Sequence, residues 1–102
     1  MARFHFTYPT ALVLQALADG ARYGFDIADR TGLQTGTVYP VLRRLDALSF
    51  VRSQWESERT ARRDQRPARR YYELTAAGSA ALAAAQDRFE GLATLAPRPR
   101  HA

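Results

Sequence analysis

The stretch GTVYPVLRRLDAL, residues 36–48, has the pattern that decides the fold. Its apolar side chains recur at the i, i+3, i+4, i+7 spacing of one helical face. They are Val38, Val41, Leu42, Leu45 and Leu48. We expect a helix with Gly36 or Thr37 as its N-cap. Pro40 then lies near the first turn, where backbone N–H groups lack intrahelical acceptors, so it should stiffen the leading end of the helix.

Two shorter helices are expected ahead of this one. ALVLQALA, residues 11–18, is apolar nearly all round, which suits a helix buried in a small bundle. YGFDIADRTG, residues 23–32, predicts a second helix whose buried side includes Phe25 and Ile27. Only LQTGT separates it from the next helix, so the two make a helix-turn-helix unit.

A basic hairpin is predicted to follow the third helix. FVRSQWE, residues 50–56, alternates in polarity, and ARRYYELT, residues 68–75, has the aromatic content of a second strand. The segment between them, residues 57–67, is polar throughout, and we expect a long loop there. Seven arginines and three acids lie between Arg52 and Arg70, which accounts for four of the five net positive charges of the chain. A basic patch of this kind attracts polyanions.

Composition argues against several classes of protein. The chain has no cysteine, which removes disulfides, thiol nucleophiles and thiolate metal sites. His5 and His101 lie at opposite ends, without a carboxylate pair, an activated nucleophile or a glycine-rich phosphate loop, so we predict no enzyme, no metal site and no cofactor. No apolar run approaches the roughly 20 residues of a membrane helix, and the first residues lack a secretory signal, which favours a cytoplasmic protein.

The order of the elements predicts the fold class. Three helices, a two-stranded basic hairpin and a C-terminal helix capped by Thr75 make a winged helix-turn-helix, an α+β fold that is mainly helical. The last helix presents Leu82, Phe89 and Leu92 on one face. The expected organisation is a winged-helix DNA-binding domain with an N-terminal arm over residues 1–74, a dimerisation helix over residues 75–95 and a disordered tail over residues 96–102.

The candidate DNA contacts come from the second helix of the helix-turn-helix, which enters the major groove, and from the wing. The predicted recognition-helix contacts are Gln34, Thr35, Thr37, Tyr39 and Arg43. Arg44 is expected to be a solvated neighbour. The predicted wing contacts, to backbone or minor groove, are Arg59, Arg62, Arg63 and Arg66. The helix alone is equally compatible with a solvated surface, but helix and wing together favour nucleic-acid binding.

The chain uses arginine for all fifteen of its basic residues. Either a GC-rich genome or selection for bidentate contacts to phosphate and guanine explains this usage. The total charge is therefore less informative than its concentration in the wing.

Several motifs resemble those of the PadR family of bacterial transcriptional regulators. YGFDI precedes GTVYPVLRRLDAL, Trp55 follows in the next strand, and RRYYELTAAG closes the hairpin, so the resemblance covers roughly residues 10–78. It implies a winged-helix homodimer, usually a repressor, whose operator is an inverted repeat and whose last helix pairs with the other subunit. The length is similar to that of the short-form members. Several members release DNA when phenolic or lipophilic compounds bind between the subunits.

The chain departs from the family pattern at defined positions. Residues 48–50, Leu-Ser-Phe, stand where the family often has glycine, so the turn there must form without glycine's freedom. The last helix has no tryptophan, so a tryptophan-lined pocket cannot be transferred to it. Trp55 packs in the core or an interface, or contacts a ligand. Of Tyr71 and Tyr72, we expect one in the core and the other at a phosphate.

The predicted function is a dimeric, sequence-specific DNA-binding regulator, a PadR-type repressor, released by a small hydrophobic or phenolic effector. Its partners would be double-stranded DNA with an inverted repeat and a second copy of the chain. The candidates for a dimer contact or effector pocket are Phe4, Phe6, Leu82, Phe89 and Leu92, with plain interface packing as the alternative. The alternative function is a winged-helix ligand-sensing or protein-interaction module for which DNA binding is secondary. The charge of the wing argues against it, because the centre of a protein interface is usually depleted of charge.

Overall fold

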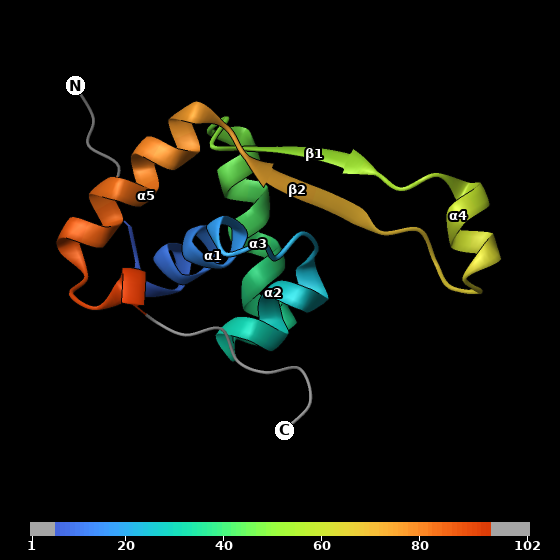
Figure 1. Cartoon of the computed structure of the whole chain (residues 1–102), viewed down its shortest axis with the longest axis horizontal. Helices are drawn as coiled ribbons and strands as arrows, with labels where there is room; N and C mark the ends of the chain where they lie inside the picture. Colours follow the sequence, from blue (N-terminus) through green and yellow to red (C-terminus); the bar gives the residue numbers. More distant parts are fainter. Residues whose placement is uncertain (1–5, 95–102) are drawn as a thin grey trace.

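The three-dimensional structure is a computed structural model that describes residues 6–94. Three helices pack together, an antiparallel two-stranded hairpin projects from them as the wing, and the last helix lies on the other side of the helical body (Figure 1). The bounds are α1 Tyr8–Ala18, α2 Gly24–Thr31, α3 Thr35–Ala47, β1 Val51–Trp55, α4 Glu58–Arg63, β2 Arg70–Leu74, α5 Ala76–Arg88 and the 3₁₀ turn η1 Leu92–Thr94. The predicted winged-helix fold is confirmed. In the described part of the chain, no helix has both the length and the apolar character needed to cross a membrane.

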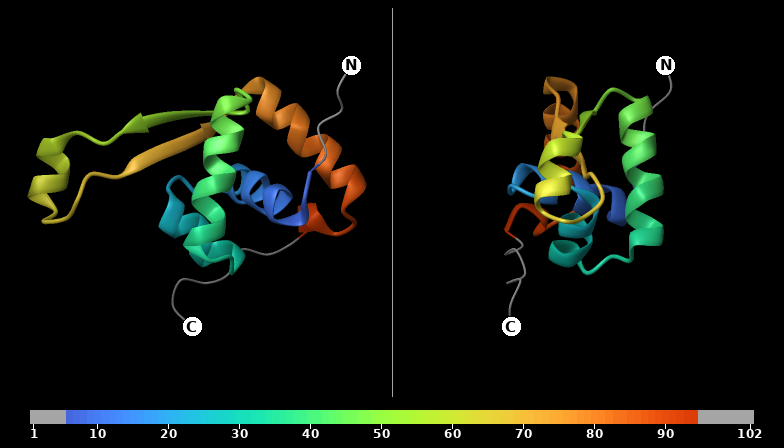
Figure 2. Two further views of the ribbon diagram at one scale, coloured as in Figure 1. Left: turned by 180° about the vertical axis from the view of Figure 1, so that it is seen from behind. Right: turned by 90° about the vertical axis from the view of Figure 1, so that its right-hand side faces the viewer.

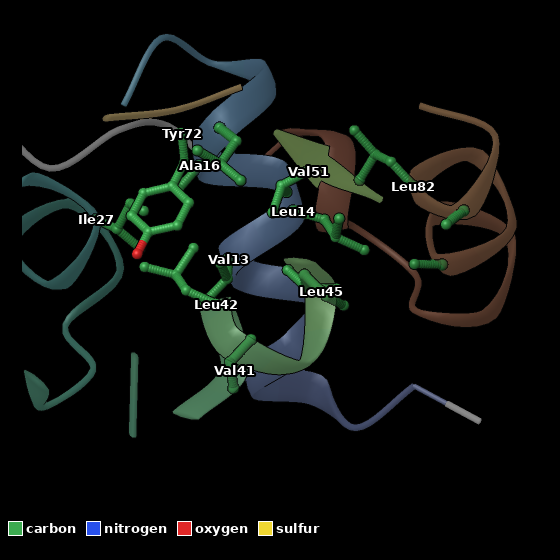
Figure 3. Packing of buried hydrophobic residues seen from close by; sticks show 14 of the residues in the cluster. Val13, Leu14, Ala16, Ile27, Val41, Leu42, Leu45, Val51, Tyr72 and Leu82 are labelled. Atoms are coloured by element: carbon green, nitrogen blue, oxygen red, sulfur yellow. The ribbon is translucent and has the colours of Figure 1, made fainter. Parts of the chain in front are cut away.

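The hydrophobic core surrounds α1, which contacts α2, α3, α5 and β2 (Figure 3). Leu14 of α1 is fully buried, and Leu42 and Leu45 of α3 lie beside it. Ile27 of α2 is fully buried as well. Four of the five residues of the apolar stripe predicted for α3 are buried, and they anchor this helix while its opposite side faces solvent. The prediction is wrong for Leu48, which is the C-cap of the helix and is 39% exposed.

α3 begins earlier than predicted. Gln34 is its N-cap, and the carbonyl of Gln34 accepts hydrogen bonds from the N–H groups of Thr37 and Val38 at 2.9 and 3.0 Å. The prediction of Gly36 or Thr37 as the N-cap is wrong, and Pro40 is the sixth residue of the helix. A proline there removes the N–H that would bond to the carbonyl of Gly36. Both residues are exposed, so water can reach this carbonyl.

The turn from α3 to β1 is made by Ser49 in the left-handed conformation, with φ of 61°. The N–H of Ser49 bonds to the carbonyl of Asp46. The N–H of Phe50 bonds to the carbonyl of Leu45, which completes a Schellman ending. The turn thus forms without glycine, as predicted, but a residue with a Cβ atom is strained there by about 1 kcal/mol.

Ser49→Gly should therefore raise the free energy of unfolding by about 0.5 to 1 kcal/mol, because glycine adopts positive φ without this strain. The gain falls below the full strain because glycine also gives the unfolded chain more freedom. Urea unfolding followed by circular dichroism measures the change. Ser49→Ala keeps the Cβ atom and should give no such gain, so an equal gain from both variants would contradict the explanation.

The tip of the wing contains a short helix that was not predicted. α4 occupies Glu58–Arg63 inside the segment expected to be a loop, so that expectation is wrong (Figure 1). The hydroxyl of Ser57 caps the helix by accepting a hydrogen bond from the N–H of Thr60 at 3.1 Å. Ala61 is the buried residue of α4. One buried side chain produces no periodic apolar pattern, which is why the sequence does not reveal this helix.

α5 is shorter than predicted. It ends at Arg88, and Phe89 is its C-cap in an extended conformation. The chain then turns through Gly91, which has a φ of 83°, and Leu92 is buried in η1 against α1 and α5. The prediction of one helix over residues 75–95 is wrong, because burial of Leu92 requires the chain to leave the helix and fold back.

Candidate nucleic-acid interface

The exposed face of α3 combines small residues with two arginines. Gly36, Pro40 and Ala47 share one line along the helix, and Arg43 and Arg44 lie on either side of it. Within residues 6–94, neither arginine side chain makes a hydrogen bond or an ion pair. Arg44, expected to be only a solvated neighbour, is therefore as available as Arg43.

The front end of α3 carries the remaining polar candidates of the recognition helix. Gln34 is exposed, whereas Thr35 and Thr37 are half-buried. Gln34 and Thr35 are the N-cap and first residue of the helix, so they occupy the end that a helix-turn-helix directs at base edges.

Tyr39 packs α3 against α2. Its ring meets the ring of Phe25 edge-on, with centroids 6.2 Å apart. It also lies over Gly24, where a Cβ atom would come within 2.5 Å of the ring. The half-buried Tyr39 ring therefore supports the helix-turn-helix unit. Phe25 was expected on the buried side of α2, but it is 66% exposed, because the Tyr39 ring covers it only from one edge.

α4 forms the tip of the projecting wing (Figure 2). It carries three of the predicted contact residues. They are Arg59, Arg62 and Arg63, and all three are exposed. Arg62 lies 3.5 Å from Glu58, and Arg63 lies 3.6 Å from Asp64. Ion pairs this exposed contribute little, about 0 to 1 kcal/mol. These guanidinium groups are consequently available to a phosphate.

Arg66, the fourth predicted wing contact, is held inside the wing. Its guanidinium group donates to both carboxylate oxygens of Glu56, one of them at 2.8 Å, and to Asp64 at 3.2 Å. The expectation that Arg66 has no internal partner is wrong. Glu56 also accepts hydrogen bonds from the hydroxyl of Tyr71 at 2.9 Å and the backbone N–H of Arg69 at 3.3 Å. We call Glu56, Arg66 and Tyr71 the wing clasp, because they join β1 and β2 to the segment that returns from α4.

The wing clasp changes the electrostatics of its members. The hydrogen bonds from Arg66 lower the pKa of Glu56 from 4.5 to about 2; burial opposes this shift, and Tyr71 and the backbone of Arg69 add to it. The same contact raises the pKa of Arg66 above its ordinary value. A carboxyl group with a lowered pKa stabilises the fold above its unfolded pKa of 4.5, and this contribution is lost as the pH falls toward 2.

Glu56→Gln should lower the melting temperature by a few degrees at pH 7, because the amide cannot replace the charged acceptor of Arg66. The difference from the unmodified chain should shrink as the pH falls from about 4.5 to about 2, where Glu56 itself becomes protonated. Thermal unfolding across this pH range measures both effects. Glu58→Gln makes the same change on an exposed α4 residue and should leave the melting temperature unchanged. A difference independent of pH would contradict the role of the charge.

Arg70 ties the opposite face of the wing to α3. It donates to the hydroxyl of Ser53 at 2.8 and 3.0 Å and lies 3.6 Å from Asp46 of α3. Its guanidinium group also lies 5.5 Å from the ring centroid of Trp55. Trp55 is 61% exposed, so it is not a core residue. No local pattern in the sequence predicts these contacts, because they join residues that are far apart in the chain.

The closing strand of the wing places its two tyrosines differently. Tyr72 is 8% exposed, which confirms the prediction that one of the pair lies in the core. The hydroxyl of Tyr71 is engaged by Glu56. The expectation that the second tyrosine meets a phosphate therefore stays a prediction, and the structure gives Tyr71 a partner inside the wing.

The residues predicted for a dimer contact or effector pocket lie mostly in this chain's own core. The buried ones are Phe6, Leu82 and Leu92. Phe89 is half-buried, and its ring lies 5.4 Å from that of the exposed Tyr8. Phe4 lies outside the described residues. Tyr8 and Phe89 thus provide the apolar surface at this end of the molecule.

The fold and its exposed basic elements define the class of the protein. A helix-turn-helix followed by a two-stranded wing, with arginines exposed on both, is a winged-helix protein. The sequence model of the PadR-like family of transcriptional regulators matches residues 13–84, and the chain belongs to this family. The resemblance predicted from the motifs is therefore confirmed.

Solved structures agree with this assignment. A PadR family transcription regulator from Clostridium difficile R20291 is 25% identical, with a TM-score of 0.69 over 80% of this chain and 86% of that one. The protein smu.1704 from Streptococcus mutans UA159 is 20% identical, with a TM-score of 0.59 over 83% of this chain and 82% of that one, and shows likeness of fold. Comparison with curated protein sequences gives no match.

Proposed function

We propose that this transcriptional regulator is a dimeric, sequence-specific DNA-binding repressor. One observation carries the proposal: five exposed arginines that have no ion pair, or only a solvent-exposed one, lie on the exposed face of α3 and on the tip of the wing. They are Arg43 and Arg44 of α3, and Arg59, Arg62 and Arg63 of α4. Two basic elements on projecting parts of a winged helix match the two grooves of a DNA duplex.

Each element has its own task on the DNA. The front end of α3 enters the major groove, where Gln34 and Thr35 meet base edges, Arg44 reads guanine, and Arg43 reaches guanine or a phosphate. The small residues Gly36 and Pro40 let the helix approach closely. The arginines of α4 neutralise phosphates or enter the adjacent minor groove.

The dimer is built through α5. Its exposed face consists largely of small side chains, which allow a second helix to pack closely. They are Ala76, Ala77, Ala80, Ala83 and Ala84. A two-fold axis there makes the operator an inverted repeat, with half-sites about 34 Å apart. The apolar surface of the exposed Tyr8 and the half-buried Phe89 suits a small hydrophobic or phenolic effector bound between the subunits.

A mobility-shift assay with the promoter fragment upstream of the chain's own gene tests this function. The dissociation constant for that fragment should be at least about tenfold lower than for an unrelated fragment of the same length. Arg44→Ala should reduce this ratio, since it removes a base contact. Equal retention of both fragments would contradict sequence-specific recognition. No retention of either would favour the alternative, a ligand-sensing or protein-interaction module.

A further inference from the structure

A cleft of about 580 Å³ lies between the wing and the helix-turn-helix unit. Its walls are formed by aromatic and arginine side chains from both sides. They include Phe25, Tyr39, Arg43, Trp55, Arg70 and Tyr72. Phe25 and Trp55 are the two most exposed of the large hydrophobic residues in the described chain, and both line this cleft. Exposed aromatic rings gathered at one concave place mark an interaction surface.

Both walls of the cleft carry a cation. Arg43 extends from α3 and has no ion pair within the described residues. Arg70 extends from β2, with 40% of its side chain exposed, and is held in place by Ser53. Its neighbour Asp46 lies 3.6 Å away, which leaves the guanidinium group able to meet another anion. The cleft therefore combines apolar rings with positive charge, and its occupant must offer apolar surface and negative charge together.

We infer that this cleft receives the sugar–phosphate strand of DNA that runs between the two grooves. The inference rests on the proposed function. A helix in the major groove and a wing in the next minor groove are separated by one backbone strand, and the first helix of a helix-turn-helix crosses that backbone. Phe25 lies in the first turn of this helix, α2, at the edge of the cleft.

The chemistry of the strand matches the lining of the cleft. Deoxyribose rings present C–H surface to Phe25 and Trp55, while the phosphates pair with Arg43 and Arg70. Contacts to sugar and phosphate make up half to two-thirds of the hydrogen bonds of protein–DNA complexes, and they set the register of the protein on the duplex. Phe25 and Trp55 are thus DNA-contacting residues, and Arg43 has a phosphate as its partner in place of a guanine edge.

Trp55 is the single tryptophan of the chain, so its fluorescence reports directly on the cleft. The full-length protein is titrated with its promoter duplex while Trp55 emission and electrophoretic mobility are followed in parallel. The emission should change with the same midpoint as the mobility shift. Phe25→Ala should weaken binding by about tenfold with an unchanged salt slope, because it removes apolar contact alone. Leu48→Ala, an exposed apolar residue outside the cleft lining, is the matched control and should bind normally.

Arg43→Gln tests the phosphate contact. It should weaken binding to the promoter and to an unrelated duplex by the same factor and make the salt slope shallower by about 1 to 2 per dimer. A selective loss of promoter binding would overturn the phosphate assignment. Circular dichroism and thermal unfolding of each variant show that a loss of binding does not come from a loss of fold.

Three other outcomes would overturn the inference. They also show whether the inference fails alone or together with the proposed function. Promoter binding without a change in Trp55 emission, with Phe25→Ala binding normally, removes the cleft from the interface and leaves the function intact. Failure to bind any duplex removes both. Quenching of Trp55 by a free mononucleotide or benzoate, with loss of DNA, would make the cleft a small-ligand site.

Discussion

Gly78→Ala should destabilise the folded chain by about 3 kcal/mol or more, because the added methyl group has no space. A Cβ atom at Gly78 would lie 1.9 Å from the carbonyl oxygen of Phe50 and 2.9 Å from its carbonyl carbon. Both are backbone atoms, which cannot rotate away as a side chain does. The first turn of α5 must therefore move off the turn between α3 and β1.

This joint, the contact between the first turn of α5 and the turn from α3 to β1, also sets the direction of α5. Thr75 donates its hydroxyl to the carbonyl of Ser49 at 2.7 Å and its N–H to the carbonyl of Phe50 at 3.1 Å. Gly78 permits this close approach. If α5 forms the dimer, its direction fixes the distance between the two recognition helices. Gly78→Ala should therefore impair DNA binding as well as stability.

Gly36→Ala is the matched control for Gly78→Ala. A Cβ atom at Gly36, in the first turn of α3, meets no atom of the described chain within 4 Å. The substitution should raise the free energy of unfolding by about 0.5 to 1 kcal/mol, since alanine favours a helix more than glycine does. Urea unfolding of both variants measures the contrast. Equal stability of the two variants would show that the joint is not tightly packed.

Replacing Arg59, Arg62 and Arg63 with alanine should lower the affinity for any duplex at least about 100-fold near 0.1 M salt. The three arginines form the tip of the wing, and their internal ion pairs are too exposed to hold them back from phosphates. The loss should be the same for the promoter and for an unrelated duplex, because phosphate contacts carry no sequence information. The magnitude of the salt slope should fall by about half or more.

The triple lysine variant at the same positions separates charge from shape. Lysine keeps the positive charges, so most of the affinity should return, apart from any contribution of bidentate geometry. A fluorescence anisotropy titration of all three proteins makes the comparison. If the alanine variant loses promoter binding alone, the arginines of the wing read bases and the proposed division of tasks is wrong. If the lysine variant binds DNA as weakly as the alanine variant, the positive charge of the wing tip is not the source of its contribution to affinity.

The helical part of the fold is predictable because its signal is local. Leu42 and Leu45 repeat at helical spacing and are fully buried. Gly32, the last residue of the range predicted for the second helix, is the C-cap of α2 in the left-handed conformation. The order of these helices and the basic hairpin is enough to predict a winged helix. The family resemblance follows from motifs that lie in the same segments.

The wing is less predictable because its structure depends on contacts between distant residues. Arg66 donates hydrogen bonds to Glu56, which lies ten positions earlier in the chain, on the other side of the hairpin. α4 has a single buried residue, Ala61, which is too little to indicate a helix. Leu92 shows the same limit, because helical spacing continues past the point where the chain folds back. Arginines in a polar segment look alike in sequence, and only tertiary contacts separate Arg66 from Arg62.

The salt dependence of DNA binding tests the central claim most directly. The dissociation constant for the promoter duplex is measured between about 50 and 200 mM salt. If about six phosphates are neutralised per dimer, log affinity should fall with log salt at a slope of about −5, a loss of about 1,000-fold across this range. Affinity that does not change with salt would contradict the claim that the arginines of α3 and the wing bind the DNA backbone.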